Sequence, residues 1–130
     1  MKITITRIVE FHLDIAHVEF STSYGEGLSN FIGPKPVENQ AHDVEIDIED
    51  EFTWNVNIFF SDKQSPSIYS SAEFLHITGE LMDITADGCG VLRIGNSLAL
   101  ISLNPIHIEK TTPFFVEIKA KKTFLYPTNI

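Results

Sequence analysis

Apolar and polar side chains alternate along most of this chain, and that alternation constrains its fold more than any other feature. A period of two places successive side chains on opposite faces of a β-strand, one toward a core and one toward solvent. The clearest case runs from residue 44 to residue 60, where every even position except Asp50 is apolar. It fits one strongly bent strand or two strands joined by a turn near Glu49–Asp50. We favour the turn, because aspartate suits a turn better than a core.

Other segments show the same alternation or short apolar runs between turn residues. An apolar series on odd positions from Ile3 changes to even positions after Ala16–His17, which predicts a bulge or bend in one long strand. The glycines and prolines of residues 21–42 predict a long loop. A polar loop is expected over 61–71, and further strands are expected at 74–84, 91–94, 98–103 and, as a terminal basic strand, 114–126.

No stretch of ten or more residues has helical spacing with plausible caps. The 130 residues fit one domain, and a domain of this size buries enough surface to fold without disulfides or metal. The sequence therefore predicts a single all-β domain over residues 1–130, with little or no helix. We expect an antiparallel sandwich or a partly open barrel of seven to nine strands.

The formal net charge is −9, and the charge is unevenly distributed. Residues 1–109 hold 17 acidic and 5 basic side chains, whereas residues 110–130 hold 1 acidic and 4 basic ones. In the predicted terminal strand Lys119 and Lys121 form a small basic stripe, which either pairs with an acidic strand or discourages edge pairing. Binding to nucleic acid is not expected, because it depends on basic side chains that displace counterions.

The predicted location is cytoplasmic. The longest apolar runs are only a few residues, whereas a membrane-spanning helix needs about 20. The alternating start of the chain lacks the apolar core of a secretory signal. The one cysteine, Cys89, cannot form an internal disulfide, which fits a reducing compartment.

No motif points to catalysis, a metal or a cofactor. The five histidines do not show the spacing of structural zinc sites, so surface positions are the favoured interpretation. Cys89 lies between two glycines of a predicted hairpin turn, without a local histidine partner. We therefore predict no catalytic residue, no metal ligand and no cofactor, and we expect that the protein is not an enzyme.

Carboxylates are concentrated in residues 43–51, where no basic residue occurs. In a strand, the alternating acids would line one outward face about 7 Å apart. That row is poorly suited to acid–base catalysis, because nothing makes the environments of its members different. It fits either a surface that recognises a basic partner or an edge strand that charge protects from aggregation. The candidate partner-binding residues are Asp43, Glu45, Asp47, Glu49, Asp50 and Glu51.

Two resemblances add to these observations. The segment 80–96, with Asp87-Gly88 and Gly95-Asn96 as turns, followed by Leu98-Ala99-Leu100-Ile101, resembles the hairpin meander of small five-stranded OB-like barrels. By size, charge and strand pattern, the whole chain resembles the small acidic all-β immunity proteins that bacteria make against their own toxin domains. That resemblance implies a non-enzymatic protein that binds and neutralises a toxin, often a basic one. No functional residue is carried over from it.

The leading hypothesis is an immunity or inhibitor-type protein that presents the acidic row to a basic protein partner such as a toxin domain. An alternative is a β-barrel that binds a small molecule in a cavity lined by Phe52 and Trp54. A third is a structural subunit that closes its sheet edge on a neighbour in a larger assembly. The oligomeric state is left open.

Overall fold

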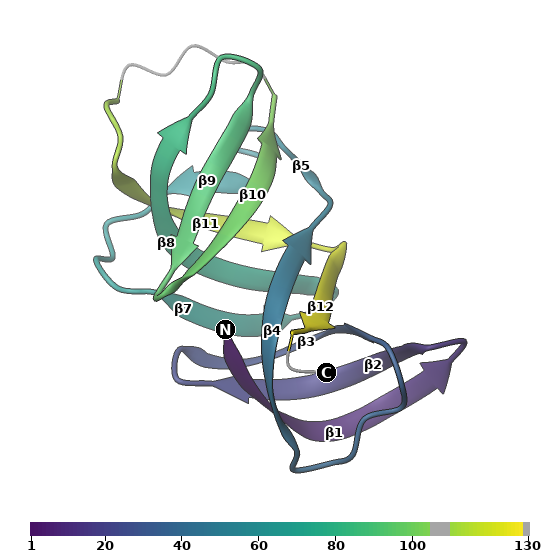
Figure 1. Cartoon of the computed structure of the whole chain (residues 1–130). Coiled ribbons are helices and arrows are strands. Elements are labelled where there is room, and N and C mark those ends of the chain that lie inside the picture. Colours follow the sequence, from purple (N-terminus) through teal and green to yellow (C-terminus); the bar gives the residue numbers. More distant parts are fainter. Residues whose placement is uncertain (105–109, 129–130) are drawn as a thin grey trace.

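The computed structural model describes residues 1–104 and 110–128, and these residues form strands and turns without a helix (Figure 1). The strands are β1 (Lys2–His12), β2 (Ile15–Thr22), β3 (Gly25–Ile32), β4 (Ala41–Ile48), β5 (Glu51–Phe52), β6 (Ile58–Phe60), β7 (Ser67–Ser71), β8 (Phe74–Ile84), β9 (Cys89–Ile94), β10 (Ser97–Leu103), β11 (Phe114–Ala120) and β12 (Thr123–Pro127). The all-β prediction is confirmed. The expected seven to nine strands are wrong, because the described residues form twelve, several too short to show a period of two.

Five strands close into a barrel in the lower half of Figure 1. Their order is β12-β4-β1-β2-β3, and β12 returns to pair with β3. The pairing of β12 with β3 is parallel, whereas its pairing with β4 is antiparallel. An antiparallel sandwich or a partly open barrel was expected, whereas this half is a closed barrel with one parallel pairing, because the last strand inserts between two strands made much earlier.

Side-chain hydrogen bonds support this closure. The hydroxyls of Ser29 on β3 and Thr123 on β12 lie 2.6 Å apart in the interior. The amide of Asn30 also donates to the carbonyl of Thr123 at 3.2 Å. Both strands thus bury polar groups that satisfy each other, which avoids the penalty of an unpaired hydroxyl in a core.

The remaining seven strands form the upper half of Figure 1, centred on β8. All residues of β11 pair with β8, over residues 75–81 of β8. β7 pairs with the first part of β8, over residues 74–78, and β9 pairs with its last part, over residues 80–84. The sheet continues through β10 to β5, and β6 pairs with β11. The buried side chains of both halves form one continuous cluster.

The apolar series changes from odd to even positions near Ala16–His17 because a hairpin turn separates two strands there. The predicted bulge or bend in one long strand is wrong. β1 ends at His12 and β2 begins at Ile15, so Leu13 and Asp14 alone make the turn. Both have positive φ, 49° and 64°, as a two-residue turn of the I′ type requires. The pair lacks the asparagine or glycine that usually identifies this turn, and Leu13 is 80% exposed.

Three predicted segments also need correction. The loop over 21–42 is wrong, because β3 lies inside it and only residues 23–24 and 33–40 connect strands. The loop over 61–71 contains β7, which pairs with β8. The single strand over 114–126 is two strands, β11 and β12, separated by the turn at Lys121–Lys122.

Candidate protein-binding site

The acidic side chains of β4 lie on its outward face. Asp43, Glu45 and Asp47 are exposed, and the residues between them are buried in the core. Glu49 and Glu51 are exposed as well, but they lie at the passage from β4 to β5, where the strand is interrupted. The structure therefore groups three of the six predicted residues in one strand row and places the others at its upper end.

Asp50 differs from the other five candidate residues, because its carboxylate accepts hydrogen bonds from the protein's own backbone. Its two oxygens accept the backbone N–H groups of Lys121 and Lys122 at 2.9 and 2.8 Å. The carbonyl of Lys122 in turn accepts the N–H of Glu49 at 2.9 Å. Asp50 thus ties the break between β4 and β5 to the turn between β11 and β12. The predicted turn at Glu49–Asp50 is thus an interruption between β4 and β5. It is not a hairpin turn, because β5 pairs with β10 and not with β4.

Replacement of Asp50 by alanine is expected to destabilise the protein by about 2 kcal/mol, because two backbone donors lose a charged acceptor. The Glu49→Ala variant is the matched control, since the carboxylate of Glu49 is exposed and makes no hydrogen bond among the described residues. Urea unfolding would measure both. Equal unfolding midpoints for the two variants would contradict the assignment of Asp50 to the fold.

Among the described residues no ion pair involves a carboxylate of the β4 row, although Lys2 on β1 is the cross-strand partner of Asp43. Among the described residues, Arg7, Arg93 and Lys121 form ion pairs with Glu19, Glu80 and Glu73, which lie on other strands or turns. The basic stripe of the C-terminal part does not pair with β4, since Lys119 lies over the rings of Phe59 and Phe74. The carboxylates of Glu45 and Asp47 are thus exposed and without an ion-pair partner among the described residues.

A hollow of about 380 Å³ lies beside this row, between β4 and β10. β4 leads into β5, and β5 pairs in parallel with the end of β10, so the two strands meet at the top and separate downward (Figure 1). We call this space the wedge. It is lined by Met1, Val44, Glu45, Ile46, Asp47, Ser97, Leu98, Ala99 and Leu100.

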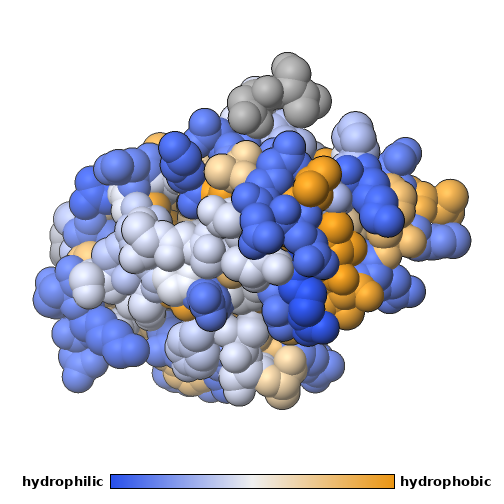
Figure 2. All heavy atoms as spheres, turned by 90° about the horizontal axis from the view of Figure 1, so that it is seen from below, coloured by the Kyte–Doolittle hydropathy of each residue, from blue (hydrophilic) through white to orange (hydrophobic). Residues whose placement is uncertain are grey.

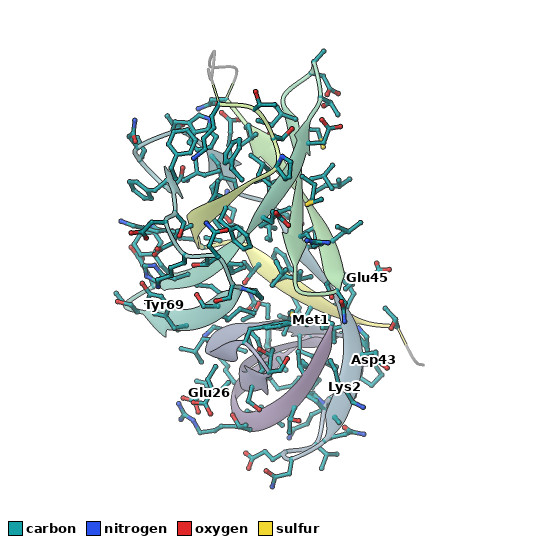
Figure 3. All side chains as sticks on the ribbon, turned by 90° about the vertical axis from the view of Figure 1, so that its left-hand side faces the viewer. Met1, Lys2, Glu26, Asp43, Glu45 and Tyr69 are labelled. Atoms are coloured by element: carbon teal, nitrogen blue, oxygen red, sulfur yellow. The ribbon has the colours of Figure 1, made fainter. Side chains whose placement is uncertain are left out.

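The β10 side of the wedge presents two leucines that the sequence analysis did not single out. Leu98 and Leu100 are 63% and 64% exposed, whereas the intervening Ala99 is buried. Figure 3 shows the other side of the wedge edge-on, with Met1 and Glu45 close together and Asp43 below them. Exposed apolar side chains beside charges are typical of protein-binding surfaces. The sequence at 98–103 could have indicated these exposed leucines, because apolar residues occupy both faces of the predicted strand.

A second apolar surface lies at the β1–β2 hairpin. Figure 2 shows apolar surface on the right of the underside, the end where this hairpin lies, with hydrophilic residues around it. The exposed apolar side chains of the hairpin are Val9, Phe11, Leu13 and Ile15. The ammonium of Lys35 lies 5.9 Å from the ring of Phe11. This surface has a cation beside it and lacks an acidic row, so its chemistry differs from that of the wedge.

A third group lies on the outer face of β7, β8 and β11. The ring of His76, 9% exposed, stacks on Tyr69 with 4.4 Å between centroids. The Tyr69 hydroxyl donates to Glu117 at 3.3 Å, and Nδ1 of His76 lies 3.7 Å from the same carboxylate. Buried oxygens of Ser67 and Thr78 nearby have no hydrogen-bond partner among the described atoms. Such atoms are usually satisfied by ordered water.

Burial raises the pKa of Tyr69 above its ordinary value, and the charge of Glu117 adds to this effect because it opposes a phenolate. We expect Tyr69 to ionise above pH about 10, and Glu117→Gln to lower its pKa toward that value. The ultraviolet titration of each protein, minus that of its Tyr69→Phe counterpart, would isolate this tyrosine. Glu10→Gln is the control, because Glu10 is exposed on β1 and is not among the residues that line the hollow beside Tyr69. An unchanged titration in Glu117→Gln would refute the contact.

The predictions on metals and on Phe52 and Trp54 can be placed in the structure. Within residues 1–104 and 110–128, no three histidine, cysteine or acidic side chains are grouped as metal ligands; His107 lies outside them. Phe52 is fully buried, and Trp54 stacks on Phe60 at 4.8 Å. Both are packed in the core. The described residues also include no helix long and apolar enough to cross a membrane.

Comparison with protein-family models, curated proteins and solved structures finds no match to this chain. The resemblance to immunity proteins stays a prediction.

Proposed function

We propose that this chain is a non-enzymatic binding protein that occludes a basic protein partner, in the manner of an immunity or inhibitor protein acting on a toxin domain. One observation carries the proposal. Leu98 and Leu100 of β10 project into solvent across a hollow from the unpaired carboxylates of Glu45 and Asp47. The leucines supply apolar contact area, and the carboxylates supply a long-range attraction for positive charge.

The proposed mechanism has two stages. The outward carboxylates first steer a basic surface toward the β4 side of the wedge, which raises the association rate without setting the final affinity. Burial of the two leucines then holds the partner, and the bulk of this protein covers the partner's active surface. Neither stage needs a reacting group in the wedge, whose lining contains no histidine, cysteine or lysine.

The test is affinity capture at low ionic strength from the organism that encodes the chain, followed by association rates at rising salt. We expect a basic partner whose association slows steeply with salt, because salt screens exposed charges. Neutralisation of that partner's activity should follow binding with equal stoichiometry. The proposal fails if the captured proteins are not basic, or if their association rates do not respond to salt.

A further inference from the structure

The edge of β10 that faces the wedge has unpaired backbone groups. On β10, the N–H of Leu103 donates to Gly88 beside β9, whereas the N–H of Asn104 donates to Phe52 on β5. The backbone N–H and C=O groups of the odd residues of β10 therefore point toward β9. Those of the even residues point toward the opposite edge, because these groups alternate in direction along a strand. β5 covers that edge only near Ser102. The N–H and C=O groups of Leu98 and Leu100 are left without a strand partner among the described residues.

The facing edge of β4 is open in the same way. The backbone carbonyl of Asp43 accepts a hydrogen bond from the N–H of Thr128. The backbone N–H and C=O groups of the odd residues of β4 therefore point toward β12. The even position Val44 exchanges two hydrogen bonds with Met1, at 2.7 and 2.8 Å. At the next even position, Ile46, the backbone N–H and C=O groups face the wedge, and no described strand pairs with them on that edge.

We infer that the wedge is a strand acceptor: an extended segment of the basic partner enters between β4 and β10 and pairs with the backbone of Leu98 and Leu100. This inference rests on the proposed function and specifies how that partner binds. Unpaired strand edges are the usual template for such additions, in which backbone hydrogen bonds provide affinity and side-chain positions provide specificity.

The side chains around the wedge specify the sequence of the occupant. Outward side chains of an inserted strand would lie between Leu98 and Leu100 on one side and the β4 carboxylates on the other. Lysine and arginine fit this position, because their aliphatic stems can cover the leucines while their charged ends reach Glu45 or Asp47. Inward side chains would lie near the buried Ile46 and Ala99, which favours apolar residues. The occupant is thus a segment in which basic and apolar residues alternate.

The probe is a short end-blocked peptide of alternating lysine and valine, and the measurement is amide hydrogen exchange. In the free protein, the amides of Leu98 and Leu100 should exchange fast and those of Ala99 and Ile101 slowly, because only the latter face β9. The peptide should slow exchange at Leu98 and Leu100 by at least about tenfold. The same peptide with every second amide methylated keeps its charges, and it should give no slowing.

Two variants separate backbone pairing from side-chain contact. Leu100→Pro removes the N–H that faces the wedge and should abolish the slowing at Leu98, while Leu100→Ala keeps that N–H and should retain most of it. Unchanged exchange with the peptide, or equal effects of the methylated peptide, overturns the strand acceptor. Capture of a salt-sensitive basic partner that leaves these amides fast would overturn this inference alone. Slowed amides without any captured basic partner would overturn the proposed function alone.

Discussion

The variant Glu45→Lys/Asp47→Lys is expected to reduce the association rate with the basic partner on the order of 100-fold. Both carboxylates are exposed on the outward face of β4, and neither forms an ion pair among the described residues, so their field acts on an approaching partner. Reversal turns attraction into repulsion at the wedge. Since each reversal adds two charges, the net charge changes from −9 to −5. Stopped-flow association at low and high salt measures the effect, which should shrink as salt rises.

The control changes the same total charge elsewhere. Glu26 and Asp62 are both exposed and lie outside the residues that line the wedge. Glu26 is on the opposite side of the view in Figure 3 from Glu45. Glu26→Lys/Asp62→Lys should change the association rate only a few-fold. If the two double variants slow association equally, net charge and not the wedge is responsible, and the site is misplaced.

Replacement of Gly25 by alanine is expected to destabilise the protein by about 4 kcal/mol, a large share of the stability of a typical domain. Gly25 has φ +137° and forms the backbone pairing of β3 with β7 at Ile68, one of the connections between the two halves among the described residues. A methyl group on Gly25 would overlap the carbonyl oxygen of Ile68. The variant must either strain the backbone or break this contact. The midpoint and slope of urea unfolding would measure the loss.

Gly33 provides a control with nearly the same backbone conformation. Its φ is +131°, but a methyl group there would meet only the ring of Pro127 at 3.9 Å. Gly33→Ala should therefore lose about 1–2 kcal/mol, from the positive φ alone. The difference between the two variants isolates the steric overlap at the β3–β7 contact. Similar losses in both would show that this contact contributes little.

The alternation of side chains was sufficient to predict the fold class and the outward acidic row. It succeeded for β4, whose one buried face repeats the signal along the strand. The bounds of β8 also match the predicted 74–84, although both faces of β8 are buried over residues 75–79. The alternation failed where strands were short or turns atypical. β5 has two residues and β6 has three, and the Leu13–Asp14 turn has no glycine to mark it.

The wedge could not be predicted from the sequence, because it depends on how distant segments pair. Glu45 and Leu100 line one hollow only because β5 joins β10 in parallel, and no local pattern specifies a parallel partner. The role of Asp50 was equally hidden, since its hydrogen-bond partners at Lys121 and Lys122 are more than seventy residues away.

The position of β12 in the barrel determines when the molecule can be completed during synthesis. The first four strands of the barrel are made early, but the strand that closes it comprises Thr123–Pro127. All strands of the upper half are translated in between. Until Thr123–Pro127 leave the ribosome, β3 and β4 lack their shared neighbour, and four core strands remain an open sheet. The nascent chain is therefore exposed to misassociation while the whole upper half is translated, and the carboxylates of β4 lie on the edge strand most in need of protection.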